Sequence, residues 1–200
     1  MRTYSRPIDM LEAMSEPYKP VICSLASGGV SAGSPVAQSE FASSAAERLD
    51  ILRRYRRIAV VGLSGNERRP SYFAAVYLQA AGYEIIPVNP RVTEILGQTC
   101  YPSLSDIPGP VDVVDVFRPS EAVPPIAEEA IAIGAKALWL QFGVIHYEAA
   151  RRAREAGLAV VMDQCMKVEH ARYFGGLNCV GLNTGVLSSR RWSPEDGRKS

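Results

Sequence analysis

The stretch that decides the fold is residues 58–71, which read IAVVGLSGNERRPS. The apolar, β-branched run 58–61 predicts a buried strand, and a loop with Gly62 and Gly65 follows it. Two arginines come next, and a Pro-Ser pair then begins a helical pattern. A strand, a glycine loop and a helix N-terminus in this order offer backbone N–H groups and the positive end of a helix dipole to an anion. The stretch therefore predicts a site for a nucleotide-like ligand.

The same alternation continues along the chain, with helical patterns that mostly end at a glycine. The predicted strands are 58–63, 84–88, 111–117, 137–141 and 158–162, and the predicted helices are 44–56, 71–81, 121–133, 146–156 and 166–173. Strands that alternate with helices favour a parallel sheet covered on both faces. We therefore expect an α/β fold with a doubly wound, mostly parallel five-stranded sheet.

Two helices can be described further from their sequence. Ser44 and Glu47 have the spacing of a capping box at the start of helix 44–56. In helix 71–81 the apolar spacing predicts an inward face, made of Phe73, Val76, Tyr77 and Ala80.

The two ends of the chain differ from the regular part. Residues 1–43 are rich in Ser, Gly and Ala and predict a weakly ordered N-terminal extension. Acidic residues precede its mildly apolar stretch 21–37, which argues against a signal peptide. We expect one domain over 44–190 and a polar C-terminal tail over 191–200.

The bulk composition excludes several classes of protein. The chain has 200 residues, a net charge of +1, 47% apolar and 22% charged residues. With so small a net charge, no overall field attracts nucleic acid or an anionic membrane. No apolar run reaches the roughly 20 residues that span a bilayer. Cys23, Cys100, Cys165 and Cys179 form no C-x-x-C pair, which favours reduced thiols in a cytoplasmic protein.

The exits of the predicted strands carry the residues that suit a ligand. These exits are 62–69, 89–91, 117–119, 141–143 and 163–165. Because the carboxyl ends of parallel strands meet at one edge, we expect these loops to lie together. Asn89 and Arg91 stand where an NAD-binding fold usually has an acidic residue, so an extra phosphate, as in NADP or coenzyme A (CoA), is favoured.

The sequence offers few residues that could catalyse a reaction, which favours a protein that binds its ligand without transforming it. A hydride-transfer enzyme needs a proton donor and a substrate pocket besides its cofactor. The chain has only two histidines, His146 and His170, and no Tyr-x-x-x-Lys pair after its strands. We expect no catalytic residue, and an NADP-dependent oxidoreductase or redox sensor remains the alternative.

Six motifs together resemble a known family. They are VVGLS (60–64) with RPS (69–71), PVNP (87–90), VFR (116–118), LWLQFGV (138–144), VMDQC (161–165) and FGGL (174–177). Residues 49–190 resemble the small stand-alone CoA-binding domain proteins, whose Rossmann-like domain is similar to that of the succinyl-CoA synthetase α subunit.

The resemblance implies CoA or an acyl-CoA in the groove at the strand C-termini. The implied binding residues are Gly62, Ser64, Gly65, Asn66, Arg68, Arg69, Ser71, Pro87, Asn89, Arg91, Phe117, Arg118, Pro119, Gln141, Gly143, Val144 and Cys165. Our hypothesis for the role is a carrier, a sensor or a regulatory or accessory subunit, and an acyl-CoA-handling enzyme is the candidate partner. The chain departs from the family at Gln164, Met166 and His146, and it lacks the synthetase domain with the phosphorylated histidine, so ligase activity is not implied.

Three smaller constellations stand beside these motifs. Cys165 precedes a helix and is either a thiol partner for CoA or a buried inert cysteine. Cys165, Glu169 and His170 have a spacing that could suit a metal ion, but without further ligands they do not predict a metal site. Asp112 and Asp115 are three apart on a strand and therefore face opposite sides, which argues against a catalytic carboxylate pair.

Overall fold

The computed structural model describes residues 41–175, and every structural statement below concerns these residues. The predicted tail 191–200 and nearly all of the predicted N-terminal extension lie outside the described part. Phe41, at the end of that extension, is buried: its ring centroid lies 5.8 Å from that of Tyr147, and the Arg154 guanidinium lies 4.7 Å from it.

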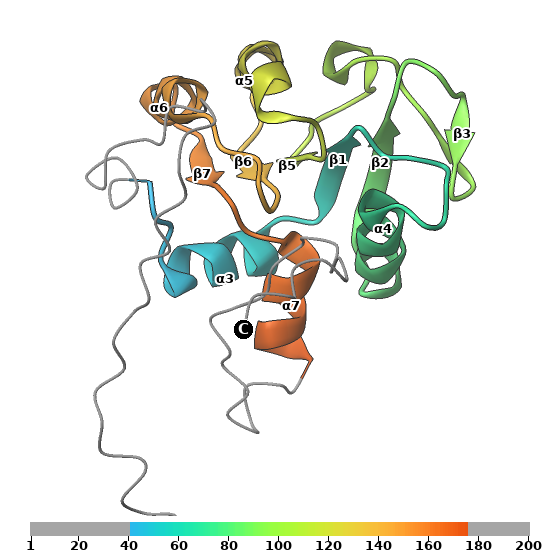
Figure 1. Ribbon diagram of the computed structural model, residues 1–200, viewed down its shortest axis with the longest axis horizontal. Coiled ribbons are helices and arrows are strands. Elements are labelled where there is room, and N and C mark those ends of the chain that lie inside the picture. Colours follow the sequence, from blue (N-terminus) through green and yellow to red (C-terminus); the bar gives the residue numbers. More distant parts are fainter. Residues whose placement is uncertain (1–40, 176–200) are drawn as a thin grey trace, which may run out of the picture. The chain divides into compact units, whose positions relative to one another are not determined.

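A parallel sheet of five strands forms the centre of the fold (Figure 1). Its strands are β1 (Arg57–Val61), β2 (Glu84–Val88), β5 (Val113–Val116), β6 (Ala137–Leu140) and β7 (Ala159–Val161). The order across the sheet is β2-β1-β5-β6-β7, and every neighbouring pair is parallel. The predicted doubly wound α/β fold is confirmed.

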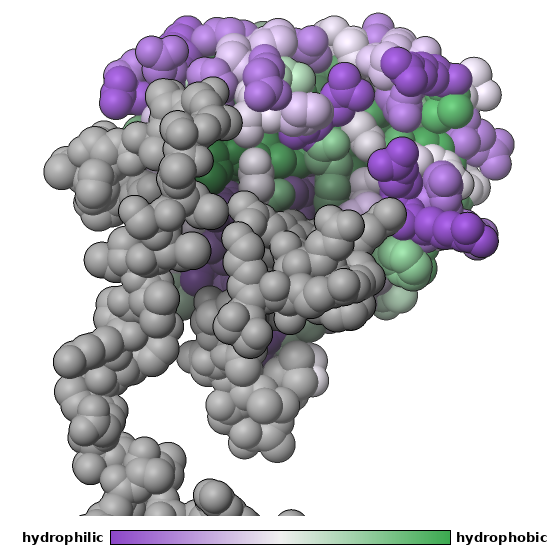
Figure 2. Space-filling model, viewed as in Figure 1, coloured by the Kyte–Doolittle hydropathy of each residue, from purple (hydrophilic) through white to green (hydrophobic). Residues whose placement is uncertain are grey.

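Helices cover both faces of this sheet (Figure 1). The helices α5 (Val123–Ala132) and α6 (Tyr147–Glu155) lie on one face, and α3 (Ala45–Arg54), α4 (Pro70–Ala80) and α7 (Met166–Phe174) lie on the other. The outer surface over α5 and α6 is largely hydrophilic (Figure 2). No helix in residues 41–175 combines the length and the apolar character that crossing a membrane requires.

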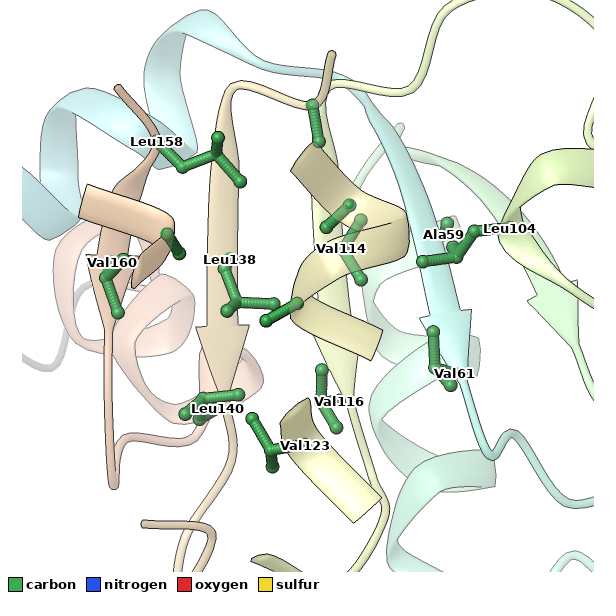
Figure 3. Packing of buried hydrophobic residues seen from close by; sticks show 14 of the residues in the cluster. Ala59, Val61, Leu104, Val114, Val116, Val123, Leu138, Leu140, Leu158 and Val160 are labelled. Carbon is green, nitrogen blue, oxygen red and sulfur yellow. The ribbon is translucent and has the colours of Figure 1, made fainter. Parts of the chain in front are cut away.

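Each face of the sheet buries its own apolar cluster. On the α5 and α6 side, Val114 and Val116 of β5 pack with Leu138 of β6 and Val123 of α5 (Figure 3). The residues that alternate with these along the strands point to the other side, where Trp139 is fully buried among residues that α3, α4 and α7 cover. This continuous apolar character of both strand faces is typical of a parallel sheet covered on two sides.

The predicted inward face of α4 is confirmed only at Tyr77, which is half-buried against the core, and is wrong at its other three residues. Phe73 and Val76 are 58% and 41% exposed, and the helix instead buries a narrower stripe of Ser71, Ala74, Ala75 and Leu78. Small side chains on this stripe let the helix lie close to the sheet. Both stripes of the helix are apolar in sequence, so spacing alone does not distinguish them.

The connection between β2 and β5 contains structure that the sequence analysis missed. The short strands β3 (Glu94–Ile95) and β4 (Gln98–Thr99) form an antiparallel hairpin, and the 3₁₀ turn η1 (Leu104–Asp106) follows. Leu96 and Gly97 in the turn both have positive φ, of 57° and 69°. Leucine seldom adopts this conformation, and turns of this kind usually have Asn-Gly or Asp-Gly. Because a leucine stands at the first turn residue, the sequence does not carry that signal.

Helices α3 and α7 are joined by a buried carboxylate. Glu169 of α7 is 1% exposed, and its two oxygens lie 2.7 Å from Arg48 Nε and 2.8 Å from Arg172 Nη1. The predicted capping box of α3 is confirmed, because Ser44 Oγ accepts from Glu47 N and Ser44 N donates to the Glu47 carboxylate. The ion pair with Arg48 therefore joins α3 to α7 on the same face of the sheet.

Candidate functional site

The loops at the carboxyl ends of the strands gather at the point where the chain reverses its direction across the sheet. From β1 the chain first moves outward to β2 and then returns to β5 on the other side of β1. Ligands of open parallel sheets bind in the crevice at such a reversal. Here the crevice lies between the β1 exit, which begins at Gly62, and the β5 exit, which begins at Phe117.

Gly62 lies where the β1 exit approaches the β5 exit. Its φ is +86°, and its N–H donates to the carbonyl oxygen of Val88 at 2.9 Å. A Cβ at this position would lie 2.7 Å from Arg118 Cδ and 2.9 Å from the carbonyl oxygen of Phe117. Glycine therefore allows the two strand exits to approach each other.

The loop after Gly62 is shaped by its own polar side chains. Ser71 Oγ accepts from Ser64 N at 3.2 Å, and Ser64 Oγ accepts from Asn66 N at 3.1 Å. Asn66 Oδ1 in turn accepts from Arg68 N at 2.9 Å. These bonds hold the loop in a compact turn that leads into α4.

The N-terminus of α4 is open. Its N-cap residue, Arg69, makes no side-chain capping bond, and Pro70 occupies the first helical position. Arg68 and Arg69 are both exposed beside it. An uncapped helix N-terminus with two flanking guanidinium groups favours an anion.

Asn89 joins the β2 exit to the β1 exit. Its Nδ2 donates to the carbonyl oxygen of Leu63 at 2.8 Å, and its Oδ1 accepts from Arg91 N at 3.0 Å. Both polar atoms of the Asn89 amide are therefore hydrogen-bonded within the protein, and these bonds orient the loop. The exposed Arg91 side chain projects from that loop.

Two pockets open along this edge. The first pocket has a volume of about 350 Å³ and is lined by Val61, Gly62, Val88, Asn89, Pro90, Arg91, Pro102, Ser103, Leu104, Arg118, Ala122, Pro125, Ile126 and Glu129. The second pocket has a volume of about 620 Å³ and is lined by Arg68, Pro70, Phe73, Ala74, Phe117, Arg118, Gln141, Phe142, Val144, Cys165, Lys167 and Val168. Arg118 lines both, so the two pockets form adjoining parts of one groove.

Most of the charged side chains that line this groove are cationic. Arg91, Arg118, Arg68 and Lys167 line it, and within residues 41–175 none of these four forms an ion pair. Glu129 is the acidic residue of the first pocket, and its Oε2 accepts from Leu104 N at 3.1 Å. The groove thus suits a ligand with several negative charges.

The profile of a family described as the CoA binding domain matches residues 56–171 of this sequence. The chain belongs to the CoA binding domain family. The family that the sequence motifs indicated is confirmed, and the matched residues include both exits of the crevice and both pockets.

Relatives of this CoA binding domain are of two kinds. The uncharacterized protein YneT of Bacillus subtilis is 48% identical over 128 residues, which are 64% of this chain and 95% of YneT. A hypothetical protein of Pyrococcus horikoshii with a solved structure is 41% identical, with a TM-score of 0.64, over 65% of this chain and 92% of that one. Acetate–CoA ligase [ADP-forming] I of Archaeoglobus fulgidus is 32% identical over 152 residues, or 70% of this chain. The match covers 21% of the ligase's length.

The structure brings most of the predicted binding loops together at one edge of the sheet. Only some of the predicted residues in these loops line a pocket. The pockets of the CoA binding domain are lined by the predicted residues Gly62, Arg68, Asn89, Arg91, Phe117, Arg118, Gln141, Val144 and Cys165. The predicted residues that line neither pocket are Ser64, Gly65, Asn66, Arg69, Ser71, Pro87, Pro119 and Gly143. Among these, Pro87 is buried inside β2 opposite Val60, and Ser64, Asn66 and Ser71 shape the loop.

Sequence reasoning missed two kinds of groove residue. Lys167 lies in the first turn of α7, and its position after a strand exit was a signal that could have found it. Ser103 lines the first pocket from the segment after the β3–β4 hairpin and Glu129 lines it from α5. Neither follows a strand of the five-stranded sheet, and nothing in their sequence marks them. Phe73, predicted to face the core, instead lines the second pocket.

A buried carboxylate lies behind the inner wall of the second pocket. Asp115 is fully buried, its Oδ1 accepts from Gln141 Nε2 at 2.7 Å, and its Oδ2 has no hydrogen-bond partner. Burial raises the pKa of Asp115 to about 7, and the bond from Gln141 opposes this shift. Burial also raises the pKa of the Cys165 thiol, and the charge of Asp115 adds to this effect.

Proposed function

We propose that this CoA binding domain binds coenzyme A, or an acyl-CoA, along the groove formed by its two pockets. The proposal rests mainly on one observation: the two pockets meet at Arg118, and Arg68, Arg91 and Lys167 line the same groove. CoA is an elongated ligand with a phosphorylated adenosine, a pyrophosphate and an apolar arm with a thiol, and each part has a chemical counterpart here.

The pyrophosphate fits the region between the β1 exit and α4. The uncapped N-terminus of α4 and the guanidinium groups of Arg68 and Arg69 supply a positive field and N–H donors. Arg118, between the pockets, supplies a third guanidinium to the same part of the ligand.

The adenosine end fits the first pocket. Arg91 lines this pocket from an exposed loop that the Asn89 side chain orients. A guanidinium there suits the 3′-phosphate that distinguishes CoA from its dephospho form. Pro90, Pro102 and Ile126 add apolar surface for the adenine ring.

The pantetheine arm fits the second pocket. This pocket is the larger of the two, and Phe73, Phe117, Phe142 and Val144 give it an apolar wall. At its inner end lie Gln141 and Cys165, which would face the thiol or the acyl group.

The proposed role is that of a carrier, a sensor or an accessory subunit without catalysis of its own. The kinship with part of an acetate–CoA ligase supports a partner that handles acyl-CoA, because in that relative the matching region belongs to a much longer chain. Co-purification of such an enzyme with the full chain tests this role separately from ligand binding.

Isothermal titration of the full chain with CoA, acetyl-CoA, NADP and NAD tests the ligand. Saturable binding of the CoA species alone is expected. Arg118→Ala should weaken CoA binding by about tenfold or more, because it removes charge-assisted hydrogen bonds to the ligand. Arg53→Ala is the matched control, since Arg53 is exposed on α3 and lines neither pocket. A preference for NADP, or equal losses in both variants, would contradict the proposal.

A further inference from the structure

The Asp115–Gln141 pair leaves one polar atom directed at the second pocket. Gln141 Nε2 donates to Asp115 Oδ1 at 2.7 Å, and both residues are buried. Gln141 Oε1 accepts no hydrogen bond from a described residue, while the side chain lines the second pocket. With its nitrogen engaged by the carboxylate, the amide offers its oxygen to the pocket as a hydrogen-bond acceptor.

Protonation of Asp115 would reverse this arrangement. A protonated carboxyl whose O–H found no acceptor would be costly in a buried site. If the Gln141 amide turns over, Oε1 accepts from a proton on Oδ1, and Nε2 is then directed at the pocket as a donor. The carboxylate thus determines whether the pocket wall offers an acceptor or a donor.

The surroundings of Asp115 leave it free to titrate. Its register partners, Val60 on β1 and Trp139 on β6, carry no charge, and the half-buried thiol of Cys165, the N-cap residue of α7, faces it. Burial raises the pKa of Asp115 to about 7, so both forms are populated near neutral pH. The cations Arg68, Arg118 and Lys167 line the pocket but form no ion pair with Asp115.

We propose that the Asp115–Gln141 pair selects between free CoA and its thioesters. In one arrangement Gln141 Oε1 accepts from the thiol of CoA, and in the other Gln141 Nε2 donates to the carbonyl of an acyl-CoA. The inference rests on the proposed function, because it needs the pantetheine arm to end in the second pocket. Asp115 acts here as a positioning residue, since it reaches the ligand only through Gln141.

Titrations with CoA and acetyl-CoA at about pH 6 and about pH 7.5 test the selection. The ratio of the Kd for acetyl-CoA to that for CoA should be about threefold to tenfold larger at the higher pH, the effect of one hydrogen bond. S-methyl-CoA, which has neither a thiol nor a thioester carbonyl, is the control for titration elsewhere in the chain.

Two variants separate this selection from a general change in affinity. Asp115→Asn keeps the shape but removes the titration, so the ratio should become independent of pH. Gln141→Met fills the same space without polar atoms and should also abolish the pH dependence, which provides a second test if the Asp115→Asn variant does not fold. An equal ratio at both pH values in the unmodified chain, with CoA still bound, would overturn this inference alone. No CoA binding at either pH would overturn the proposed function and this inference with it.

Discussion

Gly62 and Arg118 approach each other so closely that a single methyl group at residue 62 would overlap the arginine side chain. A Cβ there would lie 2.7 Å from Arg118 Cδ and 2.9 Å from the carbonyl oxygen of Phe117. The two residues belong to neighbouring strand exits, and both line the first pocket. The width of the crevice therefore depends on the absence of a side chain at residue 62.

Gly62→Ala should destabilise the fold and weaken ligand binding together. The positive φ of 86° and the overlap with Arg118 and Phe117 predict a loss of about 1–3 kcal/mol in the free energy of unfolding. Displacement of Arg118 should also reduce the affinity for CoA. Chemical denaturation and isothermal titration measure the two effects.

Gly65→Ala serves as the matched control for that substitution. A Cβ at Gly65 meets nothing within 4 Å, and its φ is not in the left-handed region. Its free energy of unfolding should change by less than about 1 kcal/mol. Equal losses in the two variants would show that the loop is sensitive to any added methyl group, against the specific role of the Gly62–Arg118 approach.

Arg91→Ala should affect the binding of only one end of the proposed ligand, the 3′-phosphate. If Arg91 binds the 3′-phosphate, the variant loses about tenfold or more in affinity for CoA while its affinity for dephospho-CoA stays the same. The double variant Arg68→Ala with Arg69→Ala should weaken both ligands alike, because these residues flank the proposed pyrophosphate position. Titration of each variant with both ligands gives the comparison. Equal losses for both ligands in Arg91→Ala would remove the 3′-phosphate assignment.

How far the sequence predicts the fold depends on how unambiguous each local pattern is. The predicted strand 84–88 coincides with β2 at both ends, because its apolar run is bounded by Gly82 on one side and Asn89-Pro90 on the other. The β3–β4 hairpin was missed because its strands have two residues each and its turn places a leucine at positive φ. Propensity reports little on such short elements, which depend on tertiary contacts.

The site shows the same limit in its side chains. Its loops could be placed at one edge from the strand order alone, since parallel strands end together. The role of Asn89 could not be predicted from the sequence. Its amide hydrogen-bonds to Leu63 and to its own loop only because the fold brings the two strand exits together. The sequence presents Asp115 as one of two carboxylates on opposite faces, but its pairing with Gln141 connects two strands and has no mark in the sequence.

Glu169→Gln should lower the stability of the fold far more than Glu128→Gln. The Glu169 carboxylate is 1% exposed and lies 2.7 Å from Arg48 Nε and 2.8 Å from Arg172 Nη1, so its neutralisation leaves two guanidinium groups without their partner. A loss of about 3–5 kcal/mol in the free energy of unfolding is typical of breaking a buried pair. The pair of Glu128 and Arg152 is 56% and 51% exposed and should contribute less than about 1 kcal/mol. Urea denaturation of both variants decides the matter, and similar losses would contradict the structural role of Glu169.

Asp115→Asn should stabilise the fold at alkaline pH and leave it nearly unchanged under acidic conditions. Burial raises the pKa of Asp115 from 3.8 to about 7, so between these values the folded chain holds a proton that the unfolded chain has released. The free energy of unfolding therefore falls as pH rises through this range, and above about 7 the folded chain carries a buried carboxylate that is hydrogen-bonded at Oδ1 alone. The amide that replaces the carboxyl group does not titrate, so the variant should gain on the parent progressively from pH 4 to pH 7, by on the order of a few kcal/mol. Denaturation curves at several pH values measure this difference, and a constant difference between the two proteins across that range would show that Asp115 is not protonated in the folded state.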